Sequence, residues 1–139
     1  MKKYLMIILI LISTLSLFSV INKINEYTTN GFSHSLYIDN EKAFIADGSK
    51  LLILDIADPV NIIECSDFQL PVVSSWIVDV FVENNIAYVV DRHNGLFIVD
   101  VSNTSNPQLI GEYLCSNLLK VIKHENIVIL KFFMIIPLI

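Results

Sequence analysis

The sequence has few basic residues, and no stripe of them runs along the chain. Nine lysines and arginines stand against fourteen aspartates and glutamates, which gives a formal net charge of −5 at neutral pH. A protein that binds nucleic acid needs a basic patch that can follow the phosphates. The few scattered lysines and arginines therefore argue against nucleic-acid binding.

Cysteine is also scarce, because Cys65 and Cys115 are the only two. If the protein is exported, these thiols can oxidise to a disulfide. They do not occupy matching places in the repeat described below, which weakens the case for a structural disulfide. Two small buried thiols are the simpler interpretation, and their redox state stays open.

Motifs for catalysis and metal binding are missing as well. His34, His93 and His124 are far apart in the chain, and no Cys-x-x-Cys, His-x-x-x-His or His-Glu-x-x-His spacing occurs, which argues against zinc. There is no Gly-x-Ser-x-Gly elbow and no phosphate loop. Ser33 and Ser35 flank His34, but neighbours along a strand point to opposite faces. We therefore expect no enzyme, no catalytic residues, no cofactor and no metal ligands.

The N-terminus carries a long apolar run without charge. The basic start MKKY precedes residues 5–20, LMIILILISTLSLFSV, which is the pattern of a secretory signal, because lysines stay cytoplasmic while the apolar helix enters the bilayer. Its length lies between that of a signal and the roughly 20 residues that span a bilayer. No Ala-x-Ala site is present. Residues 1–21 are thus predicted to be either a cleaved signal peptide or a membrane anchor, with the rest exported to the cell surface, the periplasm or the exterior.

Beyond a polar join at residues 27–35, short apolar runs alternate with turn residues. Valine, isoleucine and aromatic residues are enriched in the runs, and Asn, Asp, Gly, Ser and Pro separate them. No stretch sustains a helical period over three turns. Short strands at close spacing predict an all-β domain. Runs that are apolar on both faces, such as residues 51–56 (LLILDI), predict strands packed between neighbouring sheets.

A shift of 44 residues aligns the sequence with itself. Residues 40–47 (NEKAFIAD) fall on 84–91 (NNIAYVVD). With one residue inserted in the next turn, at His93, residues 51–55 (LLILD) fall on 96–100 (LFIVD). Small, aromatic, aliphatic and acidic positions keep their character in both copies, which indicates a structural repeat.

One copy of this repeat contains four expected strands, which in the second copy are roughly 77–82, 86–90, 96–101 and 108–113. Four strands in about 44 residues is the size of one β-propeller blade. The predicted fold is all-β: a partial β-propeller of four-stranded antiparallel blades, preceded by the N-terminal signal or anchor helix. The incomplete propeller region is 32–139, with blade-like repeats at about 32–75 and 76–117 and a partial one at 118–139.

These residues resemble the LVIVD repeat of bacterial and archaeal cell-surface proteins. That family has an Ala-aromatic-Val-Ala-Asp strand end, a Gly turn, a Leu-x-Ile-Val-Asp-Val strand and a Ser-Asn-Pro turn. The matching segments are 87–91 (AYVVD), 95–101 (GLFIVDV), 102–107 (SNTSNP), 43–48 (AFIADG) and 51–59 (LLILDIADP). Thr104, Ile62 and Lys50 depart from the family at turn positions. The resemblance implies a propeller-like fold and an exported location, and it assigns no active site.

The repeated acids are candidates for a binding role. Asp47 and Asp91 end one strand of each copy, and Asp55 and Asp100 end the next. Calcium takes six to eight oxygen ligands, and the loop at 91–95 (DRHNG) offers only a few. Asp and Asn side chains that cap turns explain the same placement, so we expect a structural role.

Two other features have both a structural and a functional interpretation. Phe32 and Trp76 match each other across the repeat. Packing between blades is the structural interpretation, and a platform on which a carbohydrate stacks is the functional one. Asn103-Thr104-Ser105 fits a glycosylation sequon, although nothing indicates a host that would use it.

The number of repeats decides the expected function. Closed propellers need about four to eight blades, and the third copy breaks off at residues 131–139 (KFFMIIPLI). We expect a fragment of a longer propeller, with self-association or a short open stack as alternatives. The expected function is a non-catalytic exported scaffold with an unknown protein or carbohydrate partner and membrane contact only through its N-terminal segment. The alternative is the N-terminal fragment of a propeller enzyme whose catalytic residues lie in missing blades.

Overall fold

The computed structural model describes residues 25–29, 31–125 and 127–132, and the regular structure among them is entirely β. The strands are β1 (Ser33–Asp39), β2 (Lys42–Asp47), β3 (Lys50–Asp55), β4 (Ile63–Gln69), β5 (Ile77–Glu83), β6 (Ile86–Asp91), β7 (Gly95–Asp100), β8 (Gln108–Leu114), β9 (Leu118–His124) and β10 (Ile127–Phe132). The expected all-β class is confirmed. The expected leader helix at residues 5–20 lies outside the described residues. None of the described segments contains a helix long and apolar enough to cross a membrane.

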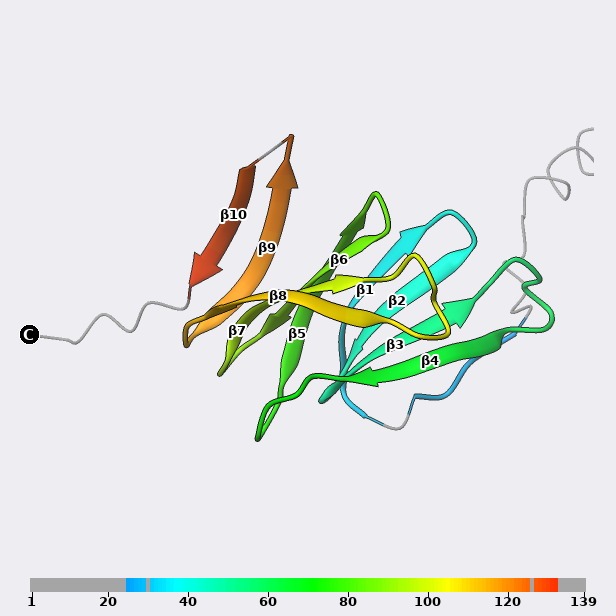
Figure 1. The fold of residues 1–139 in the computed structure, drawn as a ribbon. Helices are drawn as coiled ribbons and strands as arrows, with labels where there is room; N and C mark the ends of the chain where they lie inside the picture. The colour runs from blue at the N-terminus through cyan, green and yellow to red at the C-terminus, as the bar shows by residue number, and fades with distance from the viewer. Residues whose placement is uncertain (1–24, 30, 126, 133–139) are drawn as a thin grey trace, which may run out of the picture.

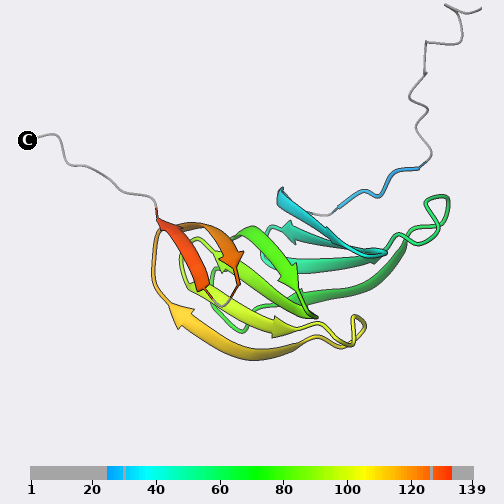
Figure 2. The same cartoon turned by 90° about the horizontal axis from the view of Figure 1, so that it is seen from above.

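The strands form three antiparallel sheets in chain order. The first sheet has the order β1-β2-β3-β4, the second β5-β6-β7-β8, and β9 pairs with β10 in a third (Figure 1). Seen from above, the first sheet, the second sheet and the β9–β10 hairpin follow one another across the molecule (Figure 2). The first strands of the three sheets are neighbours, because β5 lies beside both β1 and β9.

The four strands expected in the second copy are confirmed. They are β5 to β8, and their ends lie within one residue of the prediction.

The middle strands of each large sheet are buried because both faces meet other parts of the protein. In β3, residues 51–54 (LLIL) are all at most 5% exposed. Leu51 and Ile53 pack against the second sheet, whereas Leu52 and Leu54 pack with Ile45, Ile56, Ile62 and Tyr27, none of which belongs to another sheet. The run is therefore buried on both faces, but the expectation that it lies between two neighbouring sheets holds for one face alone. The outer strands β4 and β8 are mostly exposed.

Alternation along the strands of the second sheet distributes its side chains between two cores. Val89 and Phe97 belong to the larger core, together with Phe44 and Ile53 of the first sheet. Their chain neighbours point the other way: Val90 and Leu96 pack with Leu118 and Val121 of β9, in a core at the β9–β10 hairpin. The second sheet is thus covered on both faces.

The backbone repeats between the two copies in the turns as well as in the strands. Asn40 and Asn84 open the β1–β2 and β5–β6 turns, and both have a φ of 53°, a left-handed conformation that Asn tolerates. The Gly48 amide donates to the Phe32 carbonyl at 3.1 Å, and the Arg92 amide donates to the Trp76 carbonyl at 2.9 Å. The match of Phe32 with Trp76 is therefore confirmed.

A buried carboxylate joins the three sheets. Asp79 on β5 is 8% exposed. It accepts a hydrogen bond from Ser35 Oγ on β1 at 2.8 Å and another from the Val121 amide on β9 at 3.0 Å. Ser35 and Asp79 occupy the same position in their two copies of the repeat. Side chains at this position therefore link neighbouring sheets through hydrogen bonds.

We expect Asp79→Ala to loosen the β9–β10 hairpin. The Val121 amide would lose its acceptor in a buried setting, which costs about 1–3 kcal/mol. Amide hydrogen exchange should therefore accelerate at Val121 by more than at Val89, which lies in the core on the other face of the second sheet. Equal acceleration at both amides would show that Asp79 does not hold the hairpin.

Candidate functional site

The aspartate that ends β6 organises the turn that follows it. Asp91 is fully buried. It accepts five hydrogen bonds: from Ser75 Oγ at 2.7 Å, from the Trp76 amide at 2.7 Å, from the His93 amide at 2.8 Å, and from the Asn94 amide and Nδ2, both at 2.9 Å. Burial by itself raises the pKa of Asp91, but these hydrogen bonds outweigh it and hold the pKa below its ordinary value. The loop at 91–95 is thus folded around a structural anion.

The other repeated aspartates also cap turns. Asp55 accepts from the Ala57 amide at 2.9 Å, and Asp100 accepts from the Ser102 amide at 2.8 Å. These are the hydrogen bonds of an Asx turn. Within the described residues, no three His, Cys, Asp or Glu side chains are grouped so that they could hold a metal ion.

Asp47, the counterpart of Asp91, has a different environment. It is 7% exposed, and Ser33 Oγ donates to its Oδ1 at 3.0 Å. Among the described residues no donor reaches Oδ2. The reason is the length of the turn, because Asp47 pairs with Lys50 whereas Asp91 pairs with Gly95. The first copy therefore lacks one of the turn residues that supply amide donors in the second.

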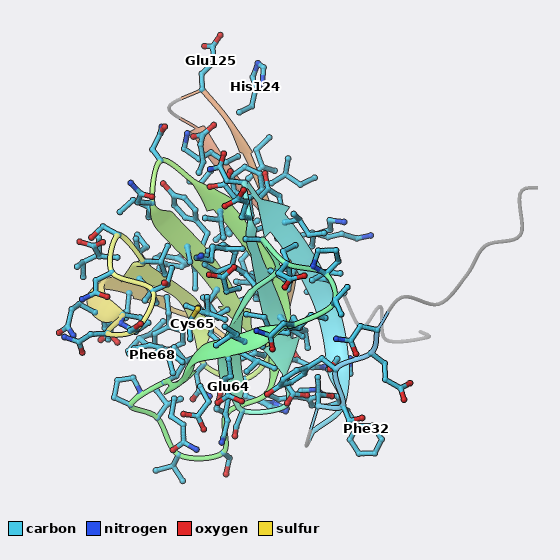
Figure 3. The ribbon with its side chains drawn as sticks, turned by 90° about the vertical axis from the view of Figure 1, so that its right-hand side faces the viewer. Phe32, Glu64, Cys65, Phe68, His124 and Glu125 are labelled. Atoms are coloured by element: carbon cyan, nitrogen blue, oxygen red, sulfur yellow. The ribbon has the colours of Figure 1, made fainter. Side chains whose placement is uncertain are left out.

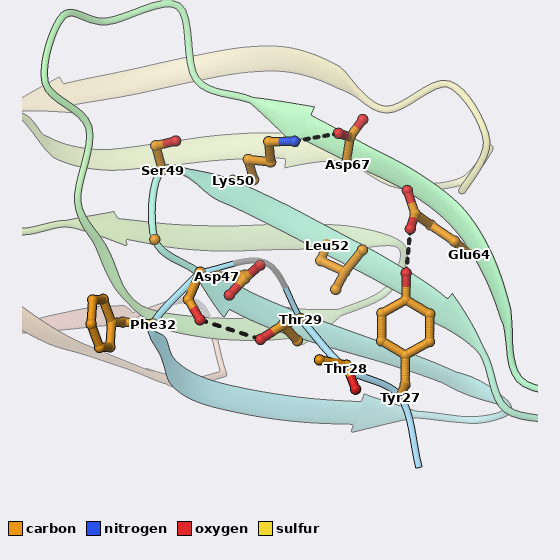
Figure 4. A pocket seen from close by; sticks show the side chains of 12 residues that line it. Tyr27, Thr28, Thr29, Phe32, Asp47, Ser49, Lys50, Leu52, Glu64 and Asp67 are labelled. Atoms are coloured by element: carbon orange, nitrogen blue, oxygen red, sulfur yellow. Dashed lines mark hydrogen bonds and ion pairs between the residues drawn. The ribbon is translucent and has the colours of Figure 1, made fainter. Parts of the chain in front are cut away.

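A pocket of about 280 Å³ lies beside Asp47 (Figure 4). It is bounded by the segment before β1, the β2–β3 turn and β4. Its wall consists of Tyr27, Thr28, Thr29, Gly31, Phe32, Asp47, Gly48, Ser49, Lys50, Leu52, Glu64 and Asp67. Aromatic and aliphatic side chains thus share the pocket with three carboxylates and one ammonium group.

Hydrogen bonds fix two pairs of side chains in this wall. The Tyr27 hydroxyl donates to the Glu64 carboxylate, and Lys50 Nζ donates to Asp67 Oδ2 at 2.5 Å. The bond to Glu64, then burial, and then the charges of Glu64, Asp47 and Asp67 raise the pKa of Tyr27 above its ordinary value. The bond with Asp67 and the attraction of its charge raise the pKa of Lys50. Both shifts reflect a pocket that is negative overall.

A second group of side chains gathers on Trp76, where the first and second sheets meet. Trp76 Nε1 donates to His34 Nε2 at 2.6 Å, and the two ring centroids are 5.5 Å apart. The His93 ring lies 5.7 Å from the Trp76 ring on centroids, and Arg92 Cζ lies 4.9 Å from the Trp76 centroid, in the range of a cation–π contact. We call His34, Trp76, Arg92 and His93 the Trp76 cluster.

Sequence reasoning missed the Trp76 cluster. His34 and His93 are distant in the chain, yet both contact one indole ring, whereas His124 lies near the tip of the β9–β10 hairpin (Figure 3). The alignment of Phe32 with Trp76 was the one available signal. Ser33 and Ser35 donate to Asp47 and Asp79, so they do not form a triad with His34.

Phe32 does not pack between sheets as expected. Its side chain is 85% exposed and points away from the sheet (Figure 3). Trp76 is half-buried because the first sheet lies beside it. No sheet among the described residues stands in the same relation to Phe32, which instead lies at the rim of the pocket.

The two cysteines are separate, free thiols. Cys65 packs against the larger core and Cys115 against the core at the hairpin. Burial raises the pKa of the Cys115 thiol, which disfavours the reactive thiolate. Both side chains are half-buried, close to the expected role of small apolar groups.

The described residues form an all-β structure in which each four-stranded sheet is one repeat. A family model, the LVIVD repeat, matches residues 31–69 and 77–115, which contain the first and the second sheet respectively. These two matches cover more than half of the chain, so the protein belongs to the LVIVD-repeat family. No curated protein and no solved structure matches the chain.

Proposed function

We propose that this protein is a non-catalytic, exported or cell-surface interaction scaffold whose sheets are blades of a β-propeller. The observation that supports it most is that the first strands of the three sheets lie side by side, with β5 beside β1 and β9. Propeller blades share this arrangement, in which four-stranded sheets surround a central channel. Export rests on the basic and apolar start of the chain, with residues 5–20 as leader or anchor.

Apolar surface at both ends of the stack supports a larger assembly. On β1, Tyr37 packs into the core, whereas its neighbours Leu36 and Ile38 are 58% and 56% exposed. On the β9–β10 hairpin, the paired Ile122 and Ile129 are 51% and 53% exposed. Stacked repeats bury such faces against further repeats. We infer that more blades, from additional repeats or from a second copy, cover them.

The Trp76 cluster is the surface where a partner would bind. An indole ring offers a flat face for stacking, and the imidazole and guanidinium groups around it offer hydrogen-bond donors. A carbohydrate or a protein partner suits this combination. The proposed function assigns the cluster no catalytic step, because no nucleophile with a base lies within it.

We expect the full chain, in mild detergent, to self-associate through the two exposed faces. Ile38→Lys combined with Ile122→Lys should weaken association by about tenfold, equivalent to about 1.4 kcal/mol, because each lysine places a charge in an apolar contact. Ile63→Lys combined with Ile110→Lys is the matched control, since these residues are 53% and 57% exposed on the outer strands β4 and β8. Analytical ultracentrifugation measures the effect, and a folded monomer at all concentrations would contradict self-association.

A further inference from the structure

The pocket beside Asp47 exists because the two repeats differ at the β2–β3 turn. In the second repeat, Ser75 Oγ and the donors of the longer turn surround the aspartate. In the first repeat, Gly31 stands at the position of Ser75, and the turn is one residue shorter. A Cβ on Gly31 would lie 2.8 Å from Asp47 Oδ1, so glycine keeps the carboxylate in place. The first repeat therefore has a hollow where the second is packed.

The wall of this hollow contains a carboxylate whose charge the described residues compensate only in part. Asp47 is 7% exposed, and among the described residues its donor is Ser33 Oγ, on Oδ1. A buried carboxylate is stable only with hydrogen bonds or a counter-charge. The single ammonium group of the wall, on Lys50, is bound to Asp67. A cationic ligand would complete the coordination of Asp47.

The chemistry of the wall indicates what kind of cation fits. A bare metal ion needs several oxygens around one point, and the described residues contain no such group of carboxylates. The space of about 280 Å³ suits a small organic group. Tyr27, Phe32 and Leu52 provide surface for methylene groups, and aromatic rings also attract an ammonium.

We propose that this pocket binds an alkylammonium group, with the nitrogen against Asp47 and the alkyl stem along Tyr27 and Leu52. A lysine side chain and a free polyamine share this chemistry. The proposal deepens the interaction role proposed above, but it depends only on the first repeat. It needs neither a closed propeller nor export.

Isothermal titration of the full chain in mild detergent tests the proposal. Pentylamine should bind at least tenfold more tightly than pentanol, which has the same shape and no charge. Asp47→Asn keeps the acceptor for Ser33 Oγ and should weaken pentylamine binding by at least tenfold. Glu64→Gln keeps an acceptor for the Tyr27 hydroxyl and should weaken binding less, by several-fold.

The control variant is Glu112→Gln. Glu112 is exposed on β8, at the position that matches Asp67 in the first repeat, and its removal changes the net charge equally. Binding to this variant should stay within twofold of the native value, and circular dichroism should show that all variants fold. Equal affinities for pentylamine and pentanol, no binding of pentylamine, or equal losses in Asp47→Asn and Glu112→Gln would each overturn the proposal.

Two further probes distinguish the sources of the ammonium group. Cadaverine represents a free polyamine, and Nα-acetyl-lysine methylamide represents a lysine in a peptide. Tighter binding of one over the other identifies the source, and failure of both overturns the proposal. Such a failure with intact self-association would leave the proposed scaffold role standing, because association uses other surfaces.

Discussion

Replacing Asp91 by alanine should lower the free energy of unfolding by about 3–5 kcal/mol, because several neutral donors would lose their shared acceptor in a buried setting. Five donors converge on this fully buried carboxylate, and buried donors without an acceptor cost about 1–3 kcal/mol each. The matched variant Asp47→Ala should cost only about 1 kcal/mol, because Ser33 is the donor there. Urea unfolding followed by far-ultraviolet circular dichroism measures both.

The same carboxylate gives the stability a specific pH dependence. Its pKa in the folded protein lies below its ordinary value, which is about 3.9 in an unfolded chain. The stabilisation by Asp91 is therefore fully present above about pH 4 and is lost as the pH falls through the lower folded pKa. Asp91→Asn should lose less stability than the native protein over that acidic range. Parallel losses in both proteins, or equal costs of Asp91→Ala and Asp47→Ala, would show that the five hydrogen bonds contribute little.

Replacing Gly95 by alanine should cost about 3 kcal/mol or more. Gly95 has a φ of +119°, which L-residues adopt with strain of about 1–3 kcal/mol. A Cβ there would also lie 2.1 Å from the Tyr113 carbonyl oxygen and 2.7 Å from the Cys115 nitrogen. Both are backbone atoms, so β8 would have to move away from β7. The loss should appear as a lower thermal midpoint and as faster amide exchange in β8.

Gly48→Ala separates the clash from the backbone strain. Gly48 also has a positive φ, of +62°, but a Cβ added to it would meet its nearest neighbour, the Gly31 Cα, only at 3.9 Å. This variant should cost about 1–2 kcal/mol, the strain of a left-handed residue alone. A Gly95→Ala variant no less stable than Gly48→Ala would mean that β7 and β8 adjust to the added carbon easily.

The strands and their repetition could be predicted because both depend on local patterns. Alternating and double-sided apolar runs such as 51–56 indicate how many faces a strand buries, and the shift of 44 residues aligned Phe32 with Trp76 correctly. The capping role of Asp91 followed from its place at a strand end before turn residues. Sequence also signalled the shorter turn, since His93 had no counterpart in the first copy.

The contacts between sheets could not be predicted in the same way. His34 and His93 meet on Trp76 because two sheets pack together, and no spacing along one strand encodes that meeting. The exposure of Phe32 depends on which sheets surround it, so its match with Trp76 gave the wrong expectation. The pocket beside Asp47 exists because the first copy has Gly31 in place of Ser75 and a turn that is one residue shorter. An alignment shows that a residue is missing but gives no indication whether its space is refilled.

At the β2–β3 turn, the surroundings of the aspartate change while the pairing of the strands on either side stays the same. The one-residue difference from the β6–β7 turn leaves the strand pairing on either side in register, yet it changes a satisfied anion into one that faces a hollow. Turn length can therefore diversify without a cost to the sheet, as surface connections generally tolerate insertions and deletions. A chain of such repeats can hold its architecture constant while each turn gives its aspartate a different set of hydrogen-bond donors.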